Sequence, residues 1–167
     1  MTMPTPEKQS ILIVDDAHSM RAMVRGLLQN LGYPHKNITA HANGLDAWHD
    51  FESRSRPFDL VICDWDMPQM NGLEFLRHIR AMEGDRANTP FIMLTANIKK
   101  EKIIEAIEEG IDDYLAKPFQ PERFKTKVMQ VISGEKRRKR VAPRPESPQR
   151  AKPLEEIPPV PITKPKR

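Results

Sequence analysis

The sequence has little that would link it to a membrane or to an oxidising compartment. Its single cysteine, Cys63, cannot form an intramolecular disulfide, which fits a reducing environment. No apolar run approaches the roughly 20 residues that a membrane-spanning helix requires. Residues 1–6 also lack the basic and apolar regions of a signal peptide. These absences predict a cytoplasmic protein without a transmembrane segment.

The charge of the chain is divided unevenly between two regions. The 167 residues suffice for one domain of ordinary size but not comfortably for two, and their formal net charge is +4. Residues 135–167 contain 11 Lys/Arg and 4 Asp/Glu, whereas residues 1–134 contain 16 basic and 19 acidic residues. The basic charge therefore belongs to the C-terminal region, and the rest of the chain has no bulk charge that would favour nucleic-acid binding.

Short apolar runs alternate with amphipathic helical patterns throughout residues 10–133. Most of the runs are continuous rather than alternating, which is typical of buried strands in parallel sheets. The predicted strands cover residues 10–14, 38–42, 60–64, 91–95 and 114–116. Apolar residues at three- and four-residue spacing predict a helix after each strand. Five strands in alternation with five helices predict an α/β fold, with a five-stranded parallel sheet covered by helices on both faces.

Local signals predict where the helices begin and end. Ser19 is a candidate N-cap for the first helix, and Asn43-Gly44 is typical of a turn before the second. Ile98 is expected to begin the apolar stripe of the fourth helix, which Gly110 ends. The fifth helix is expected between Pro121 and the glycine at position 134.

The composition changes after position 134. Residues 136–140 are all Lys or Arg, and eight of the 16 prolines lie in residues 143–167, where glycine is absent. Such a segment cannot bury a core, so residues 134–167 are predicted to form a disordered or partly polyproline II tail. Residues 1–9 are interpreted as an N-terminal extension and residues 10–133 as the single folded domain.

The tail limits the kind of output that the chain can have. The 33 residues from position 135 onward are too few and too proline-rich for a DNA-binding or catalytic output domain. The basic run is interpreted as a solvated segment, while an anionic membrane surface or an acidic partner stays open as an alternative. Nucleic-acid binding is a weaker alternative, because the tail has no aromatic residues interleaved with its basic residues. The output is therefore expected to be a protein–protein contact made by the folded domain.

Four of the five predicted strands end in a polar residue: Asp15-Asp16, Asp64, Thr95 and Lys117. In a parallel sheet these ends share one edge, which is where open α/β sheets bind their ligands. Three carboxylates held close together repel one another unless a cation is present, and Mg²⁺ prefers oxygen ligands. Lys117 suits a phosphoryl group, Thr95 offers a hydroxyl donor, and an aspartate can act as a nucleophile. Together these residues predict an aspartyl-phosphate site with Mg²⁺ as its cofactor.

Residues 10–133 resemble the receiver domain of two-component response regulators, and they are most similar to the CheY-like, single-domain chemotaxis regulators. The resemblance rests on short motifs in matching order: Val14-Asp15-Asp16, Ser19-Met20-Arg21, Asp64-Trp65-Asp66-Met67-Pro68, Asn71-Gly72-Leu73-Glu74, Leu94-Thr95-Ala96, Lys99-Lys100-Glu101, and Tyr114 with Lys117-Pro118-Phe119. It implies a flavodoxin-like (βα)5 receiver fold with strand order 2-1-3-4-5.

The resemblance implies roles for the acidic residues. Asp64 would be the phosphoacceptor. Asp16 and Asp64 would bind Mg²⁺ directly, together with the backbone carbonyl of Asp66, and Asp15 would act largely through a bound water. Asp66 replaces an asparagine that is common at this position in chemotaxis regulators, which adds a carboxylate near the metal.

The resemblance also implies a phosphoryl-binding set and a switch. Lys117, Thr95 and Ala96 would bind the phosphoryl group, and Asp64 and Lys117 would be the catalytic pair. Tyr114 would change its rotamer with the position of Thr95. The surface of the fourth helix, fifth strand and fifth helix would then present a different face to a target.

The implied function is that of a stand-alone response regulator in a phosphorelay, in chemotaxis or a related pathway. It would be a monomeric phosphoacceptor rather than an enzyme, with a histidine kinase as phosphodonor. The flagellar motor switch is a candidate for the downstream target protein. A phosphate sink or a kinase-regulating receiver is the alternative within the same family.

Two rival functions use similar residues. Phosphatases of the haloacid dehalogenase type also use Asp-x-Asp with Mg²⁺, and Asp64-x-Asp66 fits that motif superficially. That family places the motif after its first strand, whereas Asp64 follows the third predicted strand. A flavodoxin-like cofactor carrier would need a phosphate-binding loop after the first strand, where Asp15 and Asp16 would repel a phosphate.

Several single residues allow more than one interpretation. Trp65 would either contact a target or cover the site. Tyr114 would either act as the switch or be an ordinary half-exposed strand residue. Cys63 is expected to lie in the core, and the five histidines have no ligand spacing that would indicate a metal site.

Overall fold

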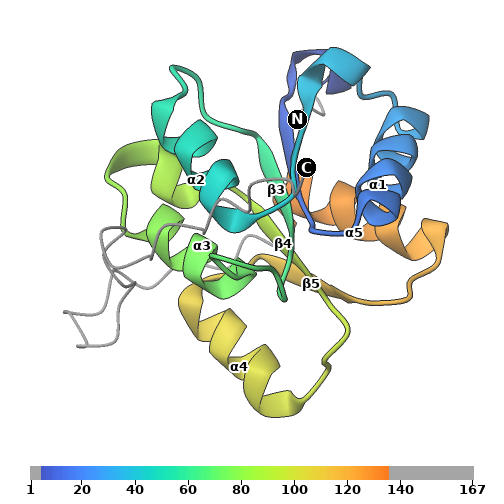
Figure 1. Ribbon diagram of the computed structural model, residues 1–167. Helices are drawn as coiled ribbons and strands as arrows, with labels where there is room; N and C mark the ends of the chain where they lie inside the picture. The colour runs from blue at the N-terminus through green and yellow to red at the C-terminus, as the bar shows by residue number, and fades with distance from the viewer. Residues whose placement is uncertain (1–4, 136–167) are drawn as a thin grey trace, which may run out of the picture.

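A parallel sheet lies between two layers of helices in the computed structural model, which describes residues 5–135 (Figure 1). The strands are β1 (Ile11–Val14), β2 (Ile38–His41), β3 (Leu60–Asp64), β4 (Phe91–Thr95) and β5 (Asp113–Ala116). The helices are α1 (His18–Asn30), α2 (Gly44–Ser53), α3 (Gly72–Arg80), α4 (Lys100–Glu109) and α5 (Pro121–Ile132). Three short 3-10 helices complete the described chain: η1 (Pro6–Lys8), η2 (His35–Asn37) and η3 (Gly84–Asn88).

The strands lie in the order β2-β1-β3-β4-β5, and each neighbouring pair is parallel. This confirms the predicted α/β class and the flavodoxin-like strand order. The register pairs Val14 with Cys63, Asp64 with Leu94, and Thr95 with Ala116. The residues that close β1, β3, β4 and β5 therefore gather at the carboxyl edge of the sheet, as the sequence predicts.

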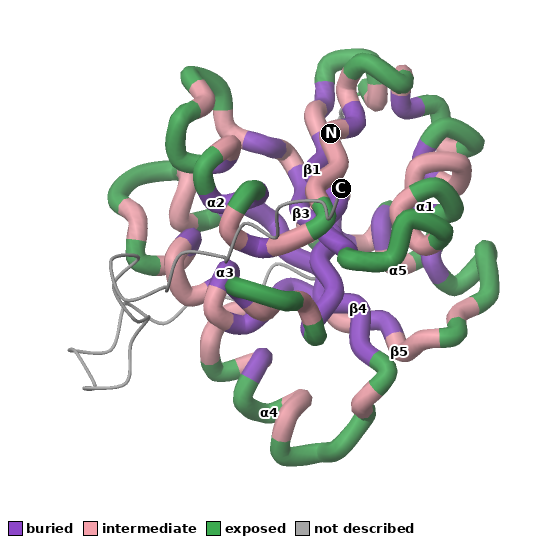
Figure 2. The backbone as a smooth tube through the Cα atoms, in the orientation of Figure 1, coloured by how far each residue is buried: buried purple, intermediate pink, exposed green. Residues whose placement is uncertain are grey.

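The sheet has a separate apolar core on each face. Val61 and Cys63 of β3 face the core beneath α2, α3 and α4, whereas Leu60 and Ile62 face the core beneath α1 and α5. Figure 2 shows the buried strands in purple between the two helical layers. Burial on both faces explains why β1, β3 and β4 are largely continuous apolar runs, whereas the edge strands β2 and β5 are only partly buried. Cys63 is a buried core residue, as expected.

Two of the predicted helix starts are wrong. Ala17 occupies the N-cap position of α1 without a side-chain cap hydrogen bond, so Ser19 lies inside the first turn and is not the N-cap. Ile98 precedes α4, which begins at Lys100, and it is 66% exposed rather than part of an apolar stripe. Gly110 does end α4, with a positive φ of 99°.

The Asn-Gly pairs begin helices instead of forming free turns. The Asn43 side chain accepts a hydrogen bond from Asp46 N, so Asn43 is the N-cap of α2 and Gly44 is the first residue of the helix. Asn71 and Glu74 form a capping box at the start of α3. Asparagine suits both roles because its side-chain oxygen can replace the missing helical acceptor.

The N-terminal residues of the described chain contact the domain. Arg56 donates a hydrogen bond of 2.7 Å to the Lys8 carbonyl, and Asn37 donates one of 2.8 Å to the Glu7 carbonyl. The predicted boundaries at residues 9 and 133 stay predictions, and the tail lies outside the described residues from position 136 onward. Within residues 5–135, no helix combines the length and apolar character that crossing a bilayer requires.

Arg80 of α3 links the end of α4 to the chain that leads into β4. Its guanidinium donates hydrogen bonds to the carbonyls of Gly110, Ala87 and Thr89, and it forms an ion pair of 3.4 Å with Asp112. Both partners of the ion pair are largely buried. Because buried carbonyls that lose a donor keep their desolvation cost, this side chain should stabilise the fold strongly.

Arg80→Met should lower the free energy of unfolding by about 3 kcal/mol, because it leaves a buried carboxylate and several carbonyls without their cation. Urea denaturation measures this change. Arg77→Met on the same helix is the control, because within residues 5–135 Arg77 forms ion pairs with the partly exposed Glu105 and Glu109, and losing them should cost less than about 1 kcal/mol. Equal losses for the two variants would contradict the buried link.

Candidate functional site

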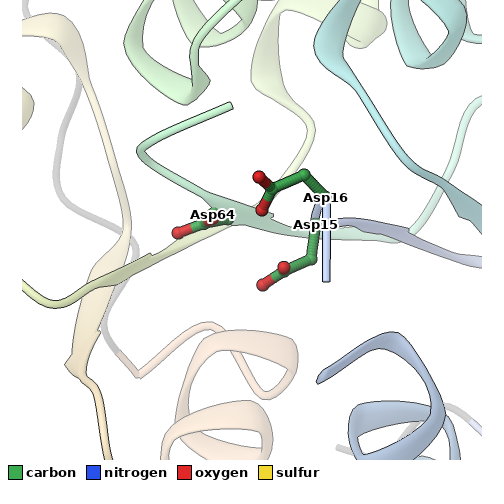
Figure 3. A group of neighbouring side chains, drawn as sticks. All are labelled: Asp15, Asp16 and Asp64. Atoms are coloured by element: carbon green, nitrogen blue, oxygen red, sulfur yellow. The ribbon is translucent and has the colours of Figure 1, made fainter. Parts of the chain in front are cut away.

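Asp64 lies at the centre of an acidic cluster at the carboxyl edge of the sheet. Asp15, Asp16 and Asp64 each offer a carboxylate oxygen, and these three atoms lie within 4.8 Å of one another. Figure 3 shows the three side chains grouped beyond the ends of β1 and β3. Asp15 and Asp64 are buried, whereas Asp16 is exposed. The sequence-predicted carboxylates therefore do meet in one place.

Lys117 connects two of these carboxylates. Its Nζ lies 2.8 Å from Asp15 Oδ2 and 3.0 Å from Asp64 Oδ1. The backbone N of Lys117 donates to the Thr95 carbonyl at 2.8 Å, which fixes the loop after β5 against the end of β4. One ammonium thus neutralises part of the charge that the buried carboxylates bring together.

Even with Lys117 present, the cluster disfavours the ionised form of the Asp64 carboxyl group. The pKa of Asp64 is raised to about 6: burial is the largest cause, the charges of Asp15 and Asp16 add to it, and the hydrogen bond and attraction from Lys117 partly offset it. Burial alone would lower the pKa of Lys117, but its hydrogen bonds to Asp15 and Asp64 outweigh this effect and raise it. The site is therefore suited to a further cation, which would favour the ionised carboxylates.

The loop between β1 and α1 holds Asp15 in place. Ala17 N donates to Asp15 Oδ1 at 2.9 Å, and Arg21 Nη1 donates to the Asp15 backbone carbonyl at 2.7 Å. The role of Arg21 was missed at the level of sequence, although the residue is part of one of the motifs that carry the resemblance. A cation one helical turn after an acidic pair was the available signal.

Thr95 and Ala96 follow β4 beside the acidic cluster. Thr95 is fully buried, and its Oγ1 donates to the Asn97 carbonyl and accepts from Asn97 N, each at 3.0 Å. Its hydroxyl is therefore bonded to the loop before α4 and not to Asp64. Ala96 is exposed. Phosphoryl binding by these two residues stays a prediction, and for Thr95 it requires that the hydroxyl leave Asn97.

The residues after Asp64 differ in their exposure. Asp66 is exposed and lies outside the group formed by Asp15, Asp16 and Asp64. Trp65 is only 4% exposed and packs into the core beneath α2, α3 and α4, with Lys102 Nζ 5.1 Å from its ring centroid. Because Trp65 is buried, it is better interpreted as a residue that covers the site than as one that contacts a target directly.

Gly72 lets α3 begin directly against the end of β3. Its N donates to the Trp65 carbonyl at 2.8 Å, and a Cβ at this position would collide with the backbone oxygen of Asp64. The loop that follows Asp64 and carries Asp66 is thus closed by a backbone contact that only glycine permits.

The side chains present fit a Mg²⁺ ion. Hard divalent cations take oxygen ligands, often one or two carboxylates together with water and phosphate oxygens. Asp16 and Asp64 offer such oxygens within 4.8 Å, and Asp15 lies beside them. The ionic repulsion within the cluster would fall when a cation binds there, so the acidic cluster is a candidate metal site.

An α/β domain of flavodoxin-like topology, with an acidic cluster and a lysine at the carboxyl edge of its sheet, defines the class of protein. Residues 11–129 match the family model of the response regulator receiver domain. The chain therefore belongs to the receiver-domain family of response regulators.

The relatives include chemotaxis proteins. The chain is 36% identical over 128 residues to a chemotaxis protein CheY homolog of Campylobacter jejuni, covering 75% of this chain and 95% of the relative. The structure of Vibrio cholerae chemotaxis protein CheY4 is 34% identical, with a TM-score of 0.65, covering 74% of this chain and 98% of that chain.

A third relative carries a metal ion. The receiver domain of the sensor histidine kinase PA1611 from Pseudomonas aeruginosa is 31% identical, with a TM-score of 0.64, covering 75% of this chain and 98% of that chain. Its structure has a magnesium ion coordinated in the active site cleft. The acidic cluster and this relative together support Mg²⁺ as the cation that suits the site.

Asp64→Asn should raise the stability of the metal-free protein at about pH 8 by about 2 kcal/mol, because it removes one of the three clustered carboxylates. The pKa of Asp64 is raised from 3.8 to about 6, so the native state binds a proton more readily than the unfolded state. The resulting stabilisation is present below pH 3.8 and is lost as the pH rises through about 6. Urea denaturation in the presence of a chelator measures the difference.

The control for this prediction is Asp66→Asn, which removes an exposed carboxylate outside the acidic cluster and should change stability by less than about 0.5 kcal/mol. A metal-free Asp64→Asn protein that is less stable than the wild type at about pH 8 would contradict a net repulsive environment at Asp64.

Proposed function

We propose that this protein is a stand-alone response regulator whose Asp64 accepts a phosphoryl group from the phosphohistidine of a kinase. The observation that carries the proposal is the position of Asp64, whose carboxylate lies within 4.8 Å of two others and 3.0 Å from Lys117. Asp15 is less suited to attack, because its two oxygens are bonded to Ala17 N and to Lys117.

The reaction is a displacement at phosphorus. An Asp64 carboxylate oxygen forms the new P–O bond, the P–N bond of the phosphohistidine breaks, and the imidazole nitrogen leaves and takes up a proton. No general base is required because the nucleophile is ionised when it attacks. Lys117 offsets the charge on the transferring oxygens, and bound Mg²⁺ would add charge neutralisation at Asp16 and Asp64.

The protein is proposed to be a phosphoacceptor and not an enzyme that turns over a separate substrate. Water that attacks the acyl phosphate returns Asp64 to its carboxylate and releases inorganic phosphate. Asp66 and Asn97 flank the site and are expected to influence the rate of this hydrolysis. A steady release of phosphate from simple phosphate esters, without a phosphorylated protein, would support a phosphatase instead.

The proposed output is a change of surface at α4, β5 and α5. Thr95 would leave Asn97 for the phosphoryl group, and Tyr114 would follow it. The names of the relatives support chemotaxis as the pathway, with the flagellar motor switch as the candidate target. A phosphate sink or a kinase-regulating receiver is the alternative, and binding of a target only by the phosphorylated form would argue against a sink.

Incubation with Mg²⁺ and acetyl phosphate tests the proposal. Intact-mass measurement should detect one added phosphoryl group per chain, and a chelator should prevent its addition. The purified monomer is expected to bind its targets more tightly when it is treated with beryllofluoride, an analogue of the phosphoryl group. No added mass under any metal condition would contradict the proposal.

A further inference from the structure

The start of β5 and the middle of α5 are joined through three side chains. Lys127 Nζ forms an ion pair of 2.8 Å with Asp113 Oδ1, and the same carboxylate oxygen accepts a hydrogen bond of 2.8 Å from Tyr114 N. Lys127 Nζ also lies 5.5 Å from the centroid of the Tyr114 ring. One ammonium therefore contacts both the residue before the tyrosine and the aromatic ring itself.

This ammonium is well shielded from water. The Lys127 side chain is 15% exposed and that of Asp113 is 8% exposed. A cation over an aromatic ring is held more tightly when it is desolvated, and an ion pair in a partly buried site is screened less by salt. Asp113 fixes the position of the ammonium, and the ammonium in turn favours the ring position that lies beneath it.

Tyr114 is connected to the site through the neighbouring strand β4, which ends in Thr95. It lies on the edge strand β5, packs against the core beneath α2, α3 and α4, and is paired in register with Met93. Two residues later on β4, the Thr95 hydroxyl is bonded to the backbone of Asn97. The ring position beneath Lys127 therefore coexists with a Thr95 hydroxyl that is bonded to its own loop.

We propose that Lys127 is a positioning residue that holds the Tyr114 ring in this arrangement, with Asp113 anchoring the lysine, and so opposes the conformational switch. The inference rests on the proposed function, because it gives the switch a restraining contact. A contact that stabilises one ring position must be lost or weakened when the ring moves. Removing it shifts the population towards the other position, and by linkage it tightens the binding of whatever favours that position.

The two tyrosines of the chain allow a direct test. Protein labelled with 3-fluorotyrosine gives one fluorine resonance from Tyr114 and one from Tyr33. Tyr33 is an internal control, since it is buried and its hydroxyl donates to Gln9 Oε1 at 3.1 Å. Titration with beryllofluoride in Mg²⁺ then measures the concentration that half-saturates the change in the Tyr114 resonance.

Lys127→Met keeps the aliphatic stem and removes the charge. Before any beryllofluoride is added, its Tyr114 resonance should move towards the frequency of the saturated wild type. Its half-saturating concentration should fall about three- to tenfold, as expected for the loss of a desolvated cation–π contact. Asp113→Asn should act in the same direction, since it releases the lysine while keeping an oxygen that can accept from Tyr114 N.

Two variants separate this role from a general loss of structure. Lys127→Arg keeps a cation and should restore both readouts to near the wild-type values. Lys125→Met removes the same charge from an exposed position on α5 and should change neither readout. A shift of the Tyr33 resonance in Lys127→Met would indicate a general change of the fold and would overturn the positioning role.

The failure of this inference differs from the failure of the proposed function. If the wild type responds to beryllofluoride and Lys127→Met matches it in both readouts, only the role of Lys127 is overturned. If the wild type does not respond at all, the function proposed for Asp64 fails, and the restraining role of Lys127 fails with it.

Discussion

Asp64→Asn should take up no phosphoryl group from acetyl phosphate in Mg²⁺, which corresponds to a loss on the order of 1,000-fold or more in the rate of labelling. The amide is neutral and lacks the anionic oxygen that attacks phosphorus. The substitution keeps the shape of the side chain and should stabilise the metal-free protein, so the variant should be folded. Intact-mass measurement over the time in which the wild type is fully labelled gives the comparison.

Asp66→Asn is the matched control for this experiment. It makes the same chemical change two residues away, at an exposed position outside the acidic cluster. The control protein should still be labelled, and at most the rates at which it gains and loses the phosphoryl group should change. Labelling of Asp64→Asn at the wild-type rate would show that another residue is the acceptor.

Lys117→Met should lower the free energy of unfolding of the metal-free protein by about 3 kcal/mol, because it leaves a fully buried carboxylate without its cation. Asp15 is 0% exposed and pairs with Lys117 Nζ at 2.8 Å. The pKa of Lys117 is raised in the folded protein, mainly by its hydrogen bonds, against the opposing effect of burial. A raised lysine pKa contributes stability below the ordinary lysine pKa, and therefore throughout the neutral range, and this contribution is lost only at strongly alkaline pH.

The same variant should be rescued in part by Mg²⁺, since a bound cation would neutralise the carboxylates that Lys117 no longer reaches. Urea denaturation with and without Mg²⁺ measures both effects. Lys125→Met, at an exposed position on the neighbouring helix α5, should change stability by less than about 0.5 kcal/mol. A Lys117→Met protein as stable as the wild type without metal would contradict the ion pair.

Asp64→Asn and Lys117→Met should therefore move stability in opposite directions, although both substitutions alter the same ion pair. One removes a charge that the cluster holds in excess, and the other removes the charge that offsets it. A site that served only to stabilise the fold would lose stability in both variants. The opposite signs are expected where stability is given up to keep three carboxylates together.

The sequence could predict the fold and the acidic cluster because both depend on local patterns. Continuous apolar runs identify strands that are buried on both faces, and parallel connections bring their ends to a single edge. Once Asp15, Asp16 and Asp64 are placed at strand ends, their proximity follows from the topology. The alternation of strands and helices needs no knowledge of side-chain contacts.

Other features depend on local geometry that residue type does not determine. Ser19 is a good N-cap residue, but α1 begins one residue before it. Ile98 fits an apolar spacing, yet it lies in the loop before α4 and is exposed. The Thr95 hydroxyl bonds to Asn97 two residues later, a contact that the sequence pattern does not indicate. In each case a short-range hydrogen bond or turn competes with the pattern.

Contacts between residues far apart in sequence were also beyond prediction. Arg80 reaches Gly110 and Asp112, and Lys127 reaches Asp113. Nothing in the spacing of these residues indicates which charged side chains turn inward, because charged residues on helices usually face water. The packing of the helices decides which charged side chains turn inward. It thereby places Lys127, the residue proposed to restrain Tyr114, beside the Tyr114 ring.

The most direct test of the account is to locate the phosphoryl group itself. Borohydride reduces an aspartyl phosphate to homoserine, so reduction of the acetyl phosphate-treated protein followed by tandem mass spectrometry identifies the modified residue. We predict homoserine at position 64 in the wild type, and none when Mg²⁺ is removed by a chelator. Homoserine at position 15, 16 or 66 instead, or at no position, would contradict the assignment of Asp64 as the phosphoacceptor.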